Sequence, residues 1–195
     1  ALKEFEVKVL TSQDRMLALE YQLFGQIRQE IQGHITAMQQ TARAIARVDC
    51  LYSLACAAHD NRYVRPGLNR DQVIQIKDGR HPIIEQFLKN ELFVPNDVTM
   101  NHTNHEILVI TGPNMAGKST YMRQIAVLIL MAQVGSFIPA REASICPVDR
   151  IFTRIGASDD ILTGQSTFMV EMKEVSYILQ HATSRSLLIL DEIGR

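Results

Sequence analysis

The most constraining feature of the sequence is a short apolar run that leads into a glycine-bounded loop and then into a helix-like segment. The run "EILVIT" (Glu106–Thr111) is nearly all apolar, as in strands that are buried on both faces of a parallel sheet. It is followed by Gly112, Gly117, Lys118 and Ser119, which match the pattern G-x-x-x-x-G-K-[ST]. A strand, a phosphate loop and a helix in this order predict a nucleotide-binding α/β domain.

The composition of this loop has a physical reason at each defining position. Glycines permit backbone angles and a close approach that a side chain would block. The N–H groups of the loop and the positive end of the following helix attract phosphate. The Lys118 ammonium can reach the β- and γ-phosphates, and the Ser119 hydroxyl can ligate Mg²⁺. The residues expected to contact nucleotide are Gly112, Pro113, Asn114, Met115, Ala116, Gly117, Lys118, Ser119 and Thr120.

A second apolar run, "SLLILDE" (Ser186–Glu192), ends in two carboxylates. Asp191 follows the predicted strand at its carboxyl end, where ligands bind in open α/β sheets. An aspartate there can hold the Mg²⁺ of a phosphate-loop site, and Glu192 beside it is suited to polarise the attacking water. The alternative is that one of the two carboxylates only caps the strand. Small GTPases follow their metal aspartate with D-x-x-G, so the order Asp-Glu favours an ATPase with Glu192 and Lys118 as catalytic residues.

The rest of the chain predicts two parts that meet near residue 66. From about Ser12 to His59, apolar residues recur at steps of three and four, which predicts long helices that start with Ser12 as N-cap and break at Gly33. Pro66-Gly67 marks a boundary between a helical segment, 1–66, and an α/β domain, 67–195.

Within the second part, strands alternate with helices, which predicts a largely parallel sheet. A buried helix is expected from Ser119 to about Val134, a strand at Asp149–Gly156, and a helix that Ser166 opens. That last helix should bury one apolar face, formed by Phe168, Met172, Val175 and Leu179. Asp78-Gly79 is expected to form a turn.

Composition narrows the choice of partners and compartment. The chain has 20 basic and 21 acidic residues, so it shows no sign of the basic surface that usually binds nucleic acid. Its three cysteines are scattered, as expected for reduced thiols in a cytosolic protein. The first residues do not resemble a signal peptide, and the longest apolar run, Ile125–Ala132, is far below the ~18 residues of a membrane span. We therefore expect a cytoplasmic protein with no membrane partner.

Three longer strings carry a family resemblance: "TGPNMAGKSTYMRQIA", "DRIFTRIGASDDILTGQSTFMVEM" and "LLILDEIGR". Together they resemble the ATPase domain of the MutS family of bacterial DNA mismatch-recognition proteins, and "DGRHPIIE" is also typical of it. The resemblance covers about Asp78 to Arg195, and the helical first third fits the family's lever region less specifically. It implies a P-loop NTPase fold of the ABC type, with a mostly parallel sheet and two sites formed across a homodimer interface.

The resemblance also implies roles for individual residues. The segment "TGQSTF" would be the signature that reaches the nucleotide of the opposite subunit, with Ser166 as its hydroxyl donor at a helix N-terminus. An ordinary N-cap role for Ser166 stays open. Phe93 in "ELFVPN" would stack on the adenine ring, although an isolated phenylalanine in such a stretch is more often part of a core. Ala116 departs from the family, since many members have glycine there.

The resemblance implies a working cycle driven by ATP and Mg²⁺. Closure of the dimer would be transmitted through the helical lever to regions that hold mismatched double-stranded DNA, with MutL as a downstream partner and a nucleoid-associated location. One alternative is a relative that acts on DNA junctions or recombination intermediates. Another is a non-catalytic scaffold, which the Asp191-Glu192 pair disfavours. The family pattern continues past Arg195, so we expect the chain alone to hydrolyse ATP weakly or not at all.

Overall fold

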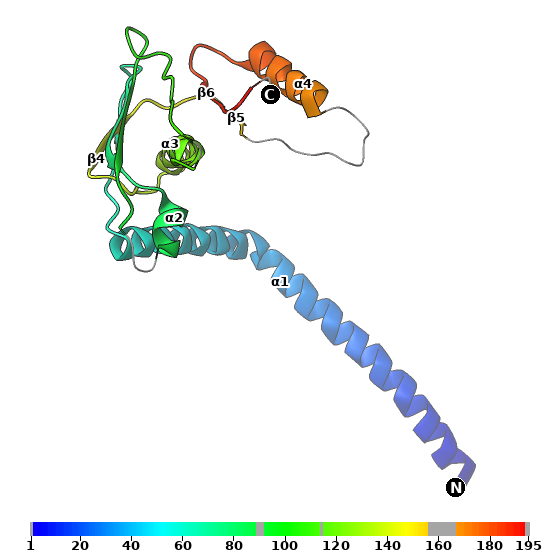
Figure 1. Ribbon diagram of the computed structural model, residues 1–195. Coiled ribbons are helices and arrows are strands. Elements are labelled where there is room, and N and C mark those ends of the chain that lie inside the picture. The colour runs from blue at the N-terminus through cyan, green and yellow to red at the C-terminus, as the bar shows by residue number, and fades with distance from the viewer. Residues whose placement is uncertain (1, 89–91, 114, 156–166, 194–195) are drawn as a thin grey trace. The chain divides into compact units, whose positions relative to one another are not determined.

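The computed structural model describes residues 2–88, 92–113, 115–155 and 167–193 (Figure 1). By its internal contacts the chain divides into two units, Ala1–Ser53 and Leu54–Arg195, and each is described by itself. The elements in chain order are α1 (Leu2–Asp60), β1 (Gly67–Leu68), β2 (Ile74–Gly79), α2 (Pro82–Phe87), β3 (Asn96–Met100), α3 (Lys118–Gln133), β4 (Glu142–Ile145), β5 (Ile151–Arg154), α4 (Thr167–His181) and β6 (Leu187–Leu190).

The first unit consists of most of α1, a continuous helix of 59 residues. The predicted helical character is confirmed, but the predicted start at Ser12 and the break at Gly33 are wrong. The Ser12 hydroxyl donates to the Val9 carbonyl oxygen at 2.7 Å, so it bonds back into the helix instead of capping it. A single glycine costs a helix only about 1 kcal/mol relative to alanine, so the favourable residues around Gly33 outweigh it. The boundary predicted at residues 66 and 67 stays a prediction.

The second unit contains two sheets. The larger has the strand order β1-β4-β2-β3, with β1 and β4 parallel and β2 antiparallel to both of its neighbours. The smaller pairs β5 and β6 in parallel. The α/β class is confirmed, whereas the mostly parallel sheet is not, because the larger sheet is mixed. Sequence periodicity identifies strands but not their direction. Moreover, α2 between β2 and β3 has only six residues, too short for the usual crossover helix of parallel strands.

At Asp78-Gly79, where the sequence predicts a turn, the structure has a shift in the register of the β2–β3 pair. Asp78 has a φ of 49°, in the left-handed region. Gly79 packs so closely that a Cβ atom there would lie 3.1 Å from the Asn96 carbonyl oxygen. The chain then turns into α2, which His81 caps by accepting from the Ile84 N–H, with Pro82 at the first helical position.

The predicted strand at Glu106–Thr111 is absent from the described structure, which is a correction to the sequence reading. The segment has no backbone pairing in either sheet. It lines a cavity of about 720 Å³, whose wall also includes residues of β6. A strand exists only when its N–H and C=O groups are bonded to a neighbouring strand. An apolar sequence alone therefore does not produce one.

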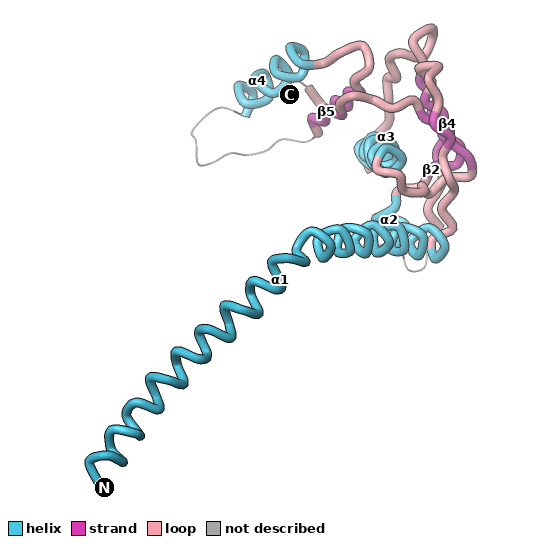
Figure 2. Tube along the Cα trace, turned by 180° about the vertical axis from the view of Figure 1, so that it is seen from behind, coloured by secondary structure: helices cyan, strands magenta, loops and turns pink. Residues whose placement is uncertain are grey.

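The core of the second unit surrounds α3, which confirms the predicted buried helix. One apolar cluster contains residues of β2, β3, β4, α3 and β6, so α3 joins both sheets to a common interior. Figures 1 and 2 both show α3 beside the larger sheet. The helix ends where Gly135 adopts a φ of 87°, and its N–H donates to the Ala132 carbonyl. The Ser136 N–H donates to the Met131 carbonyl, which completes a Schellman motif.

The predicted strands at the end of the chain are confirmed as β5 and β6, and a helix, α4, lies between them in sequence. The predicted buried face of α4 is partly wrong. Glu171 and Ile178 are buried, whereas Phe168 and Leu179 are exposed, so the inward face is rotated from the expected one. Among the described residues, no helix has the length and apolar character needed to cross a membrane.

Candidate functional site

The loop that the sequence predicts to bind phosphate is shaped by its glycines. Gly117 is the N-cap of α3, with a φ of 85°, in the left-handed region. A Cβ atom added to Gly117 would meet no other atom within 4 Å. The requirement for glycine there is therefore one of backbone conformation and not of space. Among the described residues, no side chain bonds to the helix as an N-cap, so the N–H groups of its first turn are left to attract an anion.

The Lys118 side chain folds back over the loop. Its Nζ donates to the carbonyl oxygens of Gly112 at 2.7 Å and Pro113 at 2.9 Å. These contacts hold the ammonium at the loop, which the motif requires of a phosphate-binding lysine. A phosphate oxygen carries a full negative charge and would be a stronger acceptor than either carbonyl. The observed contacts are therefore compatible with exchange for a phosphate.

The structure brings together the two residues that the sequence predicts as magnesium ligands. The Ser119 hydroxyl, in the first turn of α3, donates to Oδ2 of Asp191, which directly follows β6. The Asp191 N–H donates to the Arg154 carbonyl oxygen at 2.8 Å, so its backbone is held by the end of β5. Two sequence-distant motifs thus form a single cluster at the carboxyl end of the parallel β5–β6 pair.

This cluster fits Mg²⁺ better than a metal that requires a full protein cage. The residues that the structure describes contain no group of three or more histidine, cysteine or acidic side chains able to hold a metal. Magnesium is usually bound by one or two protein oxygen ligands together with phosphate oxygens and water. The Ser119 hydroxyl and the Asp191 carboxylate supply two oxygen donors of that kind.

Glu192 follows Asp191 with a φ of 50°, and it is exposed. A left-handed conformation is uncommon for a residue other than glycine and costs about 1–3 kcal/mol. The chain therefore turns sharply after Asp191 and places Glu192 off the line of β6. Its role as the residue that polarises water stays a prediction.

The remaining predicted site residues are less constrained by the structure. Asn114 and Ser166 lie outside the described residues. Ala116 is exposed, and its N–H donates to the Pro113 carbonyl at 3.3 Å within the loop. Phe93 is half-buried, and no ring contact or hydrogen bond of the described residues joins it to the loop. Met115 and Thr120 are in the loop and in the first turn of α3, as expected.

Two residues beside the site escaped the sequence reading. The Tyr121 hydroxyl, in the first turn of α3, donates to the Asp97 carbonyl oxygen at 2.7 Å. Arg154, at the end of β5, is nearly buried, and its Nε lies 2.8 Å from a Glu174 carboxylate oxygen, at an angle unsuited to a hydrogen bond. The signal available for Arg154 was a charged residue at the end of the short strand IFTR, whereas nothing in the sequence sets Tyr121 apart from its polar neighbours in the first turn of α3.

Comparisons with known proteins cover the site and the long helix. A family model described as MutS domain V matches residues 108–195. The DNA mismatch repair protein MutS of Lachnoclostridium phytofermentans is 57% identical over 194 residues, which is 100% of this chain and 21% of that protein. The proteins of the same name from Alkaliphilus metalliredigens and Acetivibrio thermocellus are 57% and 56% identical, each over 100% of this chain and 22% of the relative.

The chain thus spans about a fifth of the length of the curated relatives it matches. The matched region of the family model contains the phosphate loop, Ser119 and Asp191, which are the residues that the fold brings together. The relatives extend the match through α1. Because identity above one half runs over the whole chain and includes this cluster, the chain belongs to the MutS family.

Proposed function

We propose that this chain is the ATP-binding part of a DNA mismatch repair protein. The observation that carries the proposal is the hydrogen bond from Ser119 to Asp191, which joins the phosphate loop to the acidic end of β6. An incidental glycine loop would have no reason to meet the strand that the Asp191-Glu192 pair follows. The names of the relatives favour mismatch repair over action on DNA junctions or recombination intermediates.

The residues divide the work as follows. The loop N–H groups and Lys118 hold the phosphates, and Ser119 and Asp191 hold the metal. Bound Mg²⁺ supplies neutralisation of charge on the phosphate oxygens. Glu192 accepts a proton from the attacking water, a step that contributes typically 10²–10⁴-fold to a rate. Phe93 stacks on the adenine, and Ser166 serves the nucleotide of the partner subunit in a homodimer.

In this proposal α1 is a lever that couples nucleotide state to DNA-holding regions of the full protein. Coupling of this kind requires two arrangements to which nucleotide and DNA bind with different affinity. The further partners are mismatched double-stranded DNA, through regions outside this chain, and MutL. The whole protein would work at the nucleoid in the cytoplasm.

The catalytic assignment is tested in the full-length protein with Glu192→Gln. We expect this variant to bind ATP as the parent does and to lose turnover by at least about a hundredfold, because the amide cannot accept the proton. Glu20→Gln, at an exposed position of α1, is the matched control and should leave turnover unchanged. Unchanged turnover in Glu192→Gln would refute the role of Glu192.

The functional assignment is tested by DNA dependence. The full-length protein should bind a duplex with a mismatch more tightly than the same duplex fully paired, and ATP should alter that difference. Equal binding of both duplexes with or without ATP contradicts a mismatch-repair role. Preferential binding of a four-way junction would favour the junction-acting alternative.

A further inference from the structure

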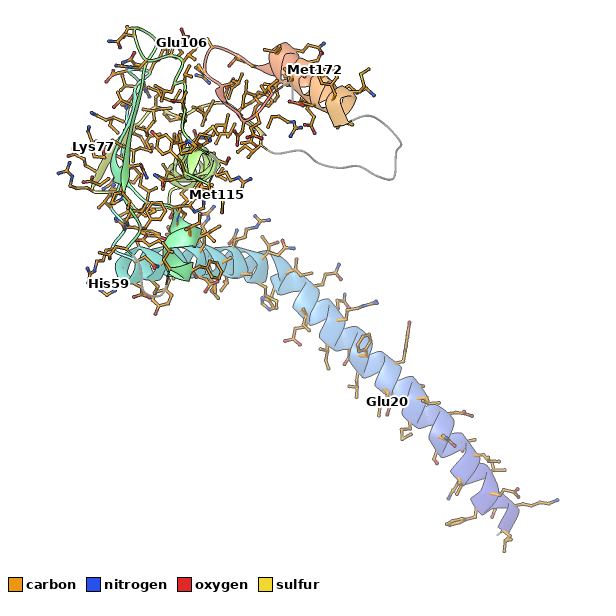
Figure 3. The ribbon with its side chains drawn as sticks, viewed as in Figure 1. Glu20, His59, Lys77, Glu106, Met115 and Met172 are labelled. Carbon is orange, nitrogen blue, oxygen red and sulfur yellow. The ribbon has the colours of Figure 1, made fainter. Side chains whose placement is uncertain are left out.

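The Tyr121 side chain attaches the first turn of α3 to β3. Tyr121 lies in the turn that begins with Lys118, and its hydroxyl donates to the Asp97 carbonyl oxygen at 2.7 Å. The ring of Tyr121 packs against the edge of the core, so the side chain is half-buried. In Figure 3, Met115 marks the loop beside α3, and Lys77 marks the neighbouring sheet. The contact therefore joins the phosphate-loop helix to that sheet.

Asp97 is held in place by β2. Its carboxylate accepts from the Asp78 N–H at 2.8 Å and from Lys77 Nζ at 3.0 Å. These contacts, that with the Asp78 N–H first, lower the pKa of the Asp97 carboxyl, so it stays ionised at neutral pH. Three contacts from two elements thus converge on Asp97, and the carbonyl that Tyr121 reaches belongs to a well-anchored residue.

The chain before Asp97 is short and leads directly to Phe93. Asn96 donates through Nδ2 to the Val94 carbonyl oxygen at 3.0 Å, and Pro95 lies between them, so the connection is bent. Four residues span at most about 14 Å even when fully extended. Phe93 therefore stays within that reach of Asp97, the residue to which Tyr121 ties the phosphate-loop helix.

We propose that Tyr121 is a positioning residue for base recognition. Its hydroxyl sets the spacing between Phe93 and the phosphate loop, so that an aromatic base can reach the Phe93 ring while the phosphates reach Lys118. Tyr121 itself touches neither the base nor the phosphates. This inference rests on the proposed function, in which the loop binds ATP and Phe93 stacks on adenine.

The Tyr121 hydroxyl is suited to hold this contact because it stays protonated. Burial and the nearby negative charge of Asp97 both raise the pKa of Tyr121. A neutral O–H bonded to a backbone carbonyl keeps its length and direction across the physiological pH range. An ion pair at this position would instead respond to salt and pH, and its charged side chains would interact with the phosphates.

The test uses Tyr121→Phe in the full-length protein, because this change removes the hydroxyl and keeps the ring. Binding of ATP and of inorganic tripolyphosphate, both with Mg²⁺, is measured by calorimetry. We expect ATP to bind about threefold to tenfold more weakly, the range for loss of one neutral hydrogen bond. Tripolyphosphate, which has no base, should bind with unchanged affinity.

A double-mutant cycle supplies the second measurement. Phe93→Ala should also weaken ATP and spare tripolyphosphate, and Tyr121→Phe should add little further loss to it, because both act on the same contact. Tyr52→Phe, at an exposed tyrosine of α1, is the matched control and should change neither ligand. The thermal unfolding temperature of each variant is recorded, so that loss of structure is recognised.

Several outcomes overturn the inference. Equal weakening of ATP and tripolyphosphate by Tyr121→Phe would show that the hydroxyl shapes the loop alone. Additive losses of ATP affinity in the double-mutant cycle would show that Tyr121 and Phe93 act independently. If the parent protein binds tripolyphosphate but gains nothing from the base, Phe93 stacking fails and Tyr121 has no base to position. If the parent binds neither ligand, the proposed function itself fails, which is a different result.

Discussion

Two apolar runs of similar composition adopt different structures in this molecule. The run in β6 is paired with β5, and its Leu187 and Ile189 are only 4% and 5% exposed. The run at Glu106–Thr111 is unpaired, and its Ile107 and Val109 are 82% and 83% exposed. The residue types are nearly the same, so the difference lies in the neighbours. A run of apolar residues predicts a strand, but only a paired edge produces one.

The test with the largest expected effect on the free energy of unfolding replaces one side chain of each run by alanine. Ile189→Ala removes a buried side chain from the core around α3 and should lower the free energy of unfolding by about 2–5 kcal/mol. Val109→Ala should change it by less than about 0.5 kcal/mol, because the side chain is already in solvent. Hydrogen exchange of the β5 and β6 amides in the full-length protein measures both. Similar losses for the two would mean that the unpaired run is buried as firmly as β6.

The second test compares the carboxylates that adjoin the two runs. Asp191→Asn should weaken Mg²⁺-dependent ATP binding by about tenfold or more, because the metal site that we propose would lose a charged oxygen. Glu106→Gln removes the same charge beside the unpaired run, where Glu106 pairs with His102, and should leave ATP affinity unchanged. Calorimetric titration at several Mg²⁺ concentrations measures both variants. An unaltered affinity in Asp191→Asn would exclude Asp191 from the metal site.

A smaller effect is expected at Arg154, which supports the paired run from β5. Its side chain is 10% exposed and lies beside a half-exposed Glu174. Arg154→Ala should lower the free energy of unfolding by about 1–2 kcal/mol, through lost packing of the stem and a partly screened ion pair. Arg150→Ala, at an exposed position just before β5, should change it by less than about 0.5 kcal/mol. Hydrogen exchange of the β6 amides distinguishes the two variants. Equal protection of these amides in both variants would show that the Arg154 side chain does not support β6.

The smallest expected effect is a pH dependence of stability. It is tested by comparing two histidines, the buried His81 and the partly exposed His102. Burial first, and then the positive charge of Arg123, lower the pKa of His81 below the usual histidine value of 6.5. The unfolded chain therefore takes up a proton more readily than the folded one. The contribution of a neutral His81 is fully present above about pH 6.5 and is lost as pH falls through the lower, folded pKa.

This pH dependence is measured as the unfolding temperature of the full-length protein between pH 5 and pH 7.5. His81→Asn keeps a side chain that can cap α2, and it should remove part of the acid sensitivity. His102→Asn should keep the acid sensitivity of the parent. Identical pH profiles for the parent and His81→Asn would rule out His81 as its source.

Some predictions from sequence held because their causes are local. The helix that follows Gly117, its end at Gly135 and the strand that precedes Asp191 depend on residues within a few positions of each other. The break expected at Gly33 did not occur, because one glycine is a small penalty within a helix of 59 residues. The inward face of α4 was misjudged, since Glu171 is buried and Leu179 is exposed. Periodicity locates a stripe, and the tertiary neighbours decide which side of it is covered.

By itself, the sequence determined the glycine-bounded loop before α3 and the Asp191-Glu192 pair that follows β6, because backbone freedom at glycine and helix initiation at Lys118 are properties of adjacent residues. Only the tertiary structure decided that Ser119 meets Asp191, that Tyr121 reaches Asp97, and that the larger sheet is mixed. Each of these depends on segments far apart in the chain. Their meeting is set by the burial of a shared core around α3 and by backbone pairing, neither of which a local pattern encodes.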